Sequence, residues 1–159
     1  MSNEYNASAA KFMYETLCTA LDNRGWTYTR HDDDLTITYG VNGDDLPMDF
    51  ILRVVKDAPI FQLFSPMPFS VPEDKRVDGA VAVSTANWGC VNGCFDYDVN
   101  DGKIMFKLTQ CFRDSLIGDE CIQYLLGLGC YMVDKYNDRF LALSKGIMSL
   151  GQFLEKENE

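Results

Sequence analysis

One histidine and a close pair of cysteines are the residues that could support nucleophilic chemistry. His31 is the single imidazole in the chain, and Cys90 and Cys94 lie four positions apart. A thiol nucleophile needs such a base within hydrogen-bonding reach. His31 precedes three aspartates at a predicted turn, where a solvated polar residue is the ordinary occupant. We predict no catalytic residue, and keep a thiol-dependent or hydrolytic enzyme centred on Cys90, Cys94 or His31 as an alternative.

Two segments contain part of a metal-binding pattern. Cys90 and Cys94 have the spacing of half a zinc site, but the other cysteines are too widely spaced to supply the second half. Residues 96–107 begin like a calcium loop, with oxygen-bearing side chains at the first, third and fifth positions. The sixth position is Asp101 instead of glycine, and the twelfth is Lys107 instead of glutamate. We predict no metal and no cofactor.

The net charge of the chain and the length of its apolar runs argue against two classes of partner, nucleic acids and membranes. The 159 residues contain 14 Lys and Arg against 24 Asp and Glu, which leaves a net charge of -10. Such a chain lacks the positive field that holds a phosphate backbone, so we expect neither nucleic acid nor a membrane as partner. The first ten residues have no signal-peptide pattern, and no apolar run approaches the length of a membrane span. We therefore expect a cytoplasmic protein whose cysteines remain thiols.

The elements that must position these residues follow from apolar periodicity. Three-and-four spacing predicts helices over residues 9–21, 73–88 and 119–143, and alternation predicts strands over 26–29, 35–39, 48–55, 60–64, 94–99 and 103–108. The segment 70–73 has the form of a capping box before the second helix. Its apolar face is expected from one set of residues: Val77, Ala80, Val81, Ser84 and Trp88. Pro66, Pro68 and Pro72 predict a connector that cannot join a regular ladder.

These elements predict an α+β fold in one domain, residues 1–159. A single antiparallel sheet is packed by the N- and C-terminal helices, in the order α-β-β-β-β-α-β-β-α. The core is expected over residues 7–146, and the tail 147–159 is either a short helix or frayed.

The order of these elements, with four sequence segments, resembles the YbjN-like family. The segments are LDNRGWTY at residues 21–28, Ala86-Asn87-Trp88, GCFDYD at 93–98 and DGKIMFK at 101–107. The family is labelled a bacterial sensory transduction regulator. Its fold is similar to that of type III secretion chaperones, which are small, acidic, usually dimeric proteins that bind partner polypeptides. The resemblance implies a type III secretion chaperone-like fold and a non-enzymatic regulatory or chaperone-like protein-binding role; a structural subunit of a larger complex is a further alternative.

The apolar alternation of the strands predicts where a partner would bind. If Phe50, Leu52 and Val54 face the core, then Ile51 and Val55 face away. If Ile60 and Phe64 point inward, Phe61 and Leu63 point outward, and Met105 and Cys111 join them. The predicted interface is therefore Ile51, Val55, Phe61, Leu63 and Met105.

Two occupants fit this predicted surface. One is a second copy of the chain in a homodimer, because a contiguous apolar patch of this kind usually marks an interface. The other is an extended peptide that adds to strand 60–64 as to a sheet edge, with Ile51, Phe61 and Leu63 as anchors. In a third interpretation, these side chains only pack under the second helix.

Overall fold

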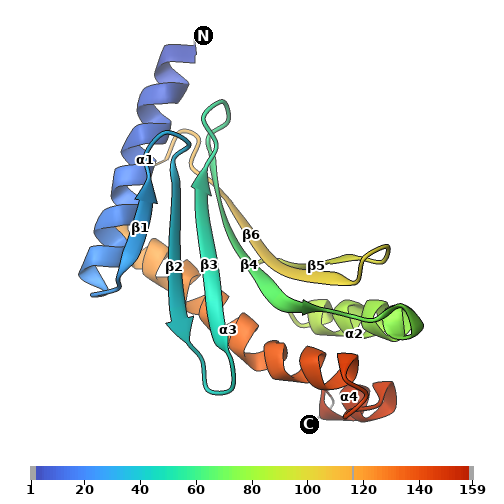
Figure 1. Cartoon of the computed structure of the whole chain (residues 1–159). Helices are drawn as coiled ribbons and strands as arrows, with labels where there is room; N and C mark the ends of the chain where they lie inside the picture. The colour runs from blue at the N-terminus through green and yellow to red at the C-terminus, as the bar shows by residue number, and fades with distance from the viewer. Residues whose placement is uncertain (1–2, 116, 158–159) are drawn as a thin grey trace.

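The computed structural model describes residues 3–115 and 117–157, and its helices lie on one side of a curved sheet (Figure 1). The elements along the chain are α1 (Asn3–Asn23), β1 (Tyr28–His31), β2 (Thr36–Asn42), β3 (Pro47–Val54), β4 (Ile60–Ser70), the 3-10 helix η1 (Glu73–Lys75), α2 (Arg76–Trp88), β5 (Cys94–Asp98), β6 (Lys103–Cys111), α3 (Asp119–Ser144) and α4 (Leu150–Lys156).

All neighbouring strands are antiparallel, and the sheet order is β1-β2-β3-β4-β6-β5. The predicted α+β fold, with one antiparallel sheet and terminal helices in the stated order, is confirmed. No helix in the described ranges has both the length and the apolar composition needed to cross a bilayer.

Along β2 to β6, alternate residues face the helices and form the core. On β3 these are Phe50, Leu52 and Val54, each 1% exposed, as the alternation predicted. α3 comes close to the sheet at Gly129, where a Cβ atom would lie 3.1 Å from Leu63 Cδ2. Because a larger side chain would push the helix outward, the glycine keeps α3 against β4.

α2 packs on the sheet through a face different from the predicted one. Its buried residues are Gly79, Ala82, Val83 and Ala86. Val77 and Trp88, predicted on the apolar face, are 75% and 94% exposed. A Cβ atom at Gly79 would lie 2.8 Å from Tyr97 Oη, so only small residues fit where α2 meets β5. The predicted capping box is also wrong, because Pro72 is the N-cap of η1 and no side chain caps it.

β4 runs through the segment predicted to be a connector. It continues to Ser70, and Pro66 is the register partner of Met105 on β6, with an irregularity between Pro66 and Ser70. Pairing between β3 and β4 ends at the Ile51 and Phe64 partners. Beyond Phe64, β4 therefore has a ladder on one side only, which is where a strand tolerates proline. Figure 1 shows β4 bending away from β3 over this stretch.

The C-terminal segment, predicted to be either a short helix or frayed, forms the helix α4. Ser149 and Gln152 cap it reciprocally: Gln152 N donates to Ser149 Oγ at 3.2 Å, and Ser149 N donates to Gln152 Oε1 at 2.9 Å. Phe153 is fully buried and stacks 5.7 Å from the Phe140 ring. The hydrophobic core thus extends beyond residue 146.

Candidate protein-binding surface

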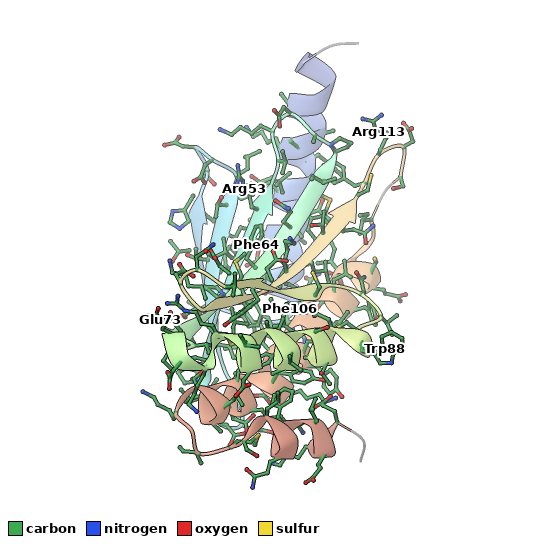
Figure 2. The ribbon with its side chains drawn as sticks, turned by 90° about the vertical axis from the view of Figure 1, so that its right-hand side faces the viewer. Arg53, Phe64, Glu73, Trp88, Phe106 and Arg113 are labelled. Atoms are coloured by element: carbon green, nitrogen blue, oxygen red, sulfur yellow. The ribbon has the colours of Figure 1, made fainter. Side chains whose placement is uncertain are left out.

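The sheet face turned away from the helices has an apolar centre. We call this surface the outer face. Its central pair is Ile51 on β3 and Phe64 on β4, which are register partners and half-buried. Met105 on β6 is half-buried on the same face. Polar neighbours in register surround these three: Thr38, Asp49, Arg53, Gln62, Asp96, Lys107 and Thr109. Arg53 and Phe64 are labelled in Figure 2.

The predicted interface residues divide between the two faces of the sheet. Ile51 and Met105 lie on the outer face, and Val55 is half-buried just after β3. Phe61 and Leu63, predicted to point outward, are each 1% exposed in the core. Their register partners are the core residues Val54 and Leu52, and partners in an antiparallel ladder share a face. The outward placement of Phe61 and Leu63 was therefore wrong.

The same register reverses the placement of their neighbours. Phe64 and Ile60 were predicted to point inward, but they lie on the outer face with Ile51 and Cys111 as respective partners. Sequence reasoning thus missed Phe64, the largest apolar side chain of the surface. The signal that could have placed it is Gln62, a polar residue in the same phase as Ile60 and Phe64, while the other phase of the segment 60–64 is wholly apolar.

β4 is also no sheet edge. It lies between β3 and β6 and pairs with both over residues 61–64, so the predicted strand addition at 60–64 has no free backbone groups there. The edges are β1 and β5. On β5, the backbone N–H and C=O of Phe95 both form hydrogen bonds with the side chain of Asn87 on α2.

A charged pair borders the apolar centre on the β5–β6 hairpin. Lys107 Nζ donates to Asp96 Oδ2 at 2.6 Å, and this hydrogen bond raises the pKa of Lys107 above its ordinary value. Cys94 Sγ lies 3.8 Å from Asp96 Oδ1. Burial is the main cause that raises the pKa of Cys94, so this thiol is not activated as a thiolate.

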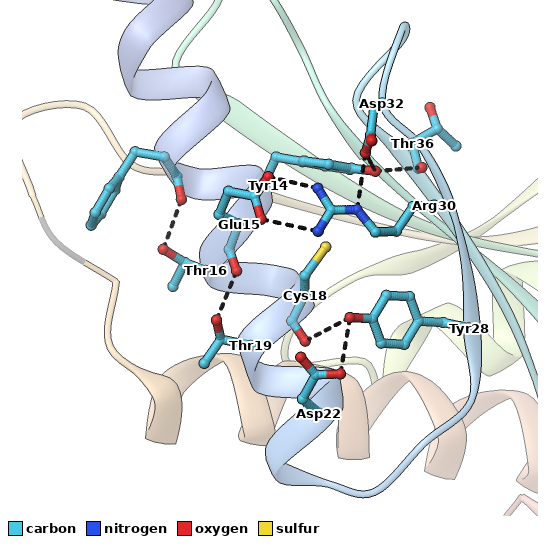
Figure 3. A network of polar contacts seen from close by, with 11 residues as sticks. Tyr14, Glu15, Thr16, Cys18, Thr19, Asp22, Tyr28, Arg30, Asp32 and Thr36 are labelled. Carbon is cyan, nitrogen blue, oxygen red and sulfur yellow. Dashed lines mark hydrogen bonds and ion pairs between the residues drawn. The ribbon is translucent and has the colours of Figure 1, made fainter.

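A polar network fastens the other edge of the sheet to α1 (Figure 3). Arg30 on β1 donates to Glu15 Oε1 at 2.6 Å and to Asp32 Oδ1 at 2.9 Å, and its guanidinium lies 5.1 Å from the centroid of the Tyr14 ring. Tyr14 Oη donates to Asp32 Oδ1 at 2.9 Å. Burial, reinforced by this hydrogen bond, raises the pKa of Tyr14 to about 12. The network links the β1–β2 hairpin to α1 and pairs Arg30 with both Glu15 and Asp32.

The structure does not bring the candidate catalytic residues together. His31 ends β1, where its Nε2 lies 3.2 Å from Thr38 Oγ1. Cys94 begins β5 at the opposite edge of the sheet, and Cys90 lies in the loop before it. Five interstrand spacings of about 4.8 Å each separate the two edges, far beyond hydrogen-bond reach. Burial raises the pKa of the Cys90 thiol as well.

The cysteines and acidic residues also form no shared ligand cluster within residues 3–115 and 117–157. No group of three or more His, Cys, Asp or Glu side chains there is arranged to hold a metal ion. All six cysteines have free thiols.

Comparisons with known proteins identify the fold. No protein-family model matches the sequence, and neither does any curated protein sequence. In structure, the chain is similar to YbjN, a proposed transcription regulator from E. coli, with a TM-score of 0.56 over 79% of this chain and 92% of YbjN. The sequence identity is 12%. The chain has a YbjN-like fold, which confirms the resemblance identified in the sequence.

Proposed function

We propose that this protein is a non-enzymatic regulatory or chaperone-like domain that binds a partner polypeptide on the outer face of its sheet. The observation that carries the proposal is the pairing of Ile51 with Phe64 on a face that no helix of the described chain covers. A contiguous apolar surface on a strongly charged protein is typical of an interaction site. Its polar border matches the rim that surrounds the apolar centre of protein interfaces.

The structural neighbour supports the regulatory part of this proposal, because YbjN is itself named as a proposed transcription regulator. The net charge of -10 disfavours direct contact with DNA. We therefore propose that regulation acts through contact with another protein. The predicted homodimer would use the same outer face, and it remains a prediction.

Serine substitutions on the two faces of β4 test the proposal. Phe64→Ser removes the outer apolar anchor and should leave the protein folded, whereas Phe61→Ser should unfold it because Phe61 is in the core. Burying an aromatic anchor contributes about 1.5–3 kcal/mol, so loss of Phe64 should weaken binding about tenfold or more. Phe12→Ser is the matched control, since Phe12 is an exposed phenylalanine on α1.

Affinity capture from cells of the source organism, followed by quantitative mass spectrometry, provides the measurement. Partners retained by wild type and Phe12→Ser should be lost with Phe64→Ser. Sedimentation of the same three proteins shows whether the captured partner is a second copy. If Phe64→Ser stays folded and retains every partner, the outer face is not the binding site.

A further inference from the structure

A second apolar surface lies on the helix layer, along the solvent side of α3. Tyr124 and Tyr131 are 56% and 61% exposed there. Cys121 is exposed one turn before Tyr124, and Leu128 is half-buried between the two tyrosines. We call these four residues the α3 strip. Their spacing of three, four and three residues places them on one face of the helix.

The α3 strip leads to an exposed tryptophan at the end of α2. Trp88 is 94% exposed and is labelled in Figure 2 beside the last turn of α2. Between Trp88 and Tyr131 lies a groove of about 520 Å³, with Thr85 and Lys135 also in its wall. Tryptophan is highly buried on average in folded proteins, and tryptophan and tyrosine are the side chains most enriched at the energetic centres of interfaces.

The geometry of the strip fits an α-helix as its occupant. Alternating steps of three and four residues are the spacing of a helix seam that packs against a second helix. From Cys121 to Tyr131 the seam is about 15 Å long, or roughly three helical turns. The groove at its end is large enough for one bulky side chain of that helix.

Charges beside the strip indicate the character of this helix. Glu120 is exposed one residue before Cys121, whereas Asp119 is turned toward α1, where it accepts a hydrogen bond from Asn23 Nδ2 at 3.3 Å. Farther along, Asp134 accepts the backbone N–H of Asp44 at 2.9 Å, which places the acidic β2–β3 loop beside the helix. The two cations near the strip have partners within the molecule. Arg24 donates a hydrogen bond to Gln123 Oε1 at 2.9 Å, and Lys135 Nζ lies 3.9 Å from Glu157 Oε2.

We propose that the α3 strip and Trp88 bind an amphipathic helix of a partner protein whose polar face is rich in lysine and arginine. A second copy of this chain is disfavoured at this site, because its strip would bring Glu120 and the acidic β2–β3 loop against like charges. The site is separate from the outer face of the sheet and does not depend on the function proposed for that face.

A designed peptide tests this site directly. The probe has 18 residues, with leucine at helix-seam positions and lysine elsewhere; a scrambled order and a version with glutamate for lysine are the comparison peptides. Trp88 reports binding by its own fluorescence in a Trp26→Phe background. We expect a saturable blue shift with the Leu/Lys helix, weakened by salt, and no shift with either comparison peptide.

Variants locate the binding. Tyr124→Ser and Tyr131→Ser should each lower the affinity for the Leu/Lys peptide at least tenfold. Calorimetry and Trp88 fluorescence both measure this affinity. Phe12→Ser and Phe64→Ser should leave its affinity unchanged. Equal binding of the scrambled peptide, unchanged affinity in both tyrosine variants, or a dimer that Tyr131→Ser dissociates would each overturn the proposal. Loss of binding in Phe64→Ser alone would also overturn it, and would assign the peptide to the outer face.

Discussion

The side chain of Asn87 forms two hydrogen bonds with the backbone of Phe95. Asn87 Nδ2 donates to Phe95 O at 3.0 Å, and Phe95 N donates to Asn87 Oδ1 at 2.7 Å. An amide side chain on α2 thus takes the place that a neighbouring strand would have at the β5 edge. Edge strands left open invite pairing with other chains, so this contact closes part of the β5 edge. At Phe95, therefore, the β5 edge is not open to strand addition by a partner.

Asn87→Ala should destabilise the protein by about 1–3 kcal/mol, because it leaves two half-buried backbone groups of Phe95 without partners. Ser84→Ala on the solvent side of α2 is the control and should change stability by less than about 0.5 kcal/mol. Urea unfolding followed by circular dichroism measures both. Equal midpoints for the two variants would contradict the role assigned to Asn87. We also expect Asn87→Ala to aggregate at concentrations where wild type stays monodisperse.

Alternation predicted the faces of β3 correctly but not those of β4. On β3 one phase is apolar at every position, Phe50, Leu52 and Val54, while the other includes Asp49 and Arg53. On β4 both phases contain large apolar residues, but the phase of Ile60 and Phe64 also contains the polar Gln62, which favours the outer face for that phase. The register with β3, which pairs Leu63 with Leu52, agrees with this signal. Pro66 and Pro68 hide the continuation of β4, because proline is typical of segments outside a regular ladder.

The buried face of α2 was missed for a different physical reason. Large apolar residues usually mark the core side of a helix. In α2 the large residues Val77 and Trp88 face solvent, and the small ones, such as Gly79 and Ala82, face the sheet. The closeness of α2 to Tyr97 selects for small volume instead of hydrophobicity. A run of glycine and alanine at helical spacing is the signal that could have indicated this face.

The C-terminal helix should be required for full stability. Phe153 is fully buried against the rings of Phe140 and Tyr136, at centroid distances of 5.7 Å and 6.5 Å. Phe153→Ala leaves a cavity in this cluster and should cost about 3–5 kcal/mol. Ile147→Ala is the control, because Ile147 is 79% exposed. Thermal unfolding with similar midpoints for both variants would show that α4 is not part of the cooperative core.

Thiol reactivity should follow exposure. Cys111 and Cys121 are exposed and should react first with iodoacetamide at pH 7.5. Cys18 and Cys130 should react last: burial raises the pKa of both thiols, that of Cys130 to about 11. Iodoacetamide labelling over time, with peptide mapping, gives the order for each site. If Cys90 or Cys94 reacts before Cys111 and Cys121, the thiol-enzyme alternative gains support.

The contact between α1 and the β1–β2 hairpin should weaken in acid. The Arg30 guanidinium, together with the Tyr14 hydroxyl, donates to the Asp32 carboxylate and holds the pKa of Asp32 below its ordinary value. Because the pKa is lower in the folded state, the stabilising contribution of Asp32 is fully present above the unfolded pKa of about 3.9. It is lost as the pH falls through the lower folded value, when the carboxyl becomes protonated and releases Arg30.

Comparing wild type with Asp32→Asn isolates this contribution from the titration of other carboxyls. At pH 7, Asp32→Asn should unfold at a lower urea concentration than wild type. At pH 3 and below the two midpoints should converge, because the wild-type carboxyl is then increasingly neutral too. Asp34→Asn, in the same exposed turn, is the control, and its urea midpoint should equal that of wild type at pH 7 and at pH 3. A constant difference between wild type and Asp32→Asn from pH 7 to pH 2 would show that the carboxylate charge does not stabilise this contact.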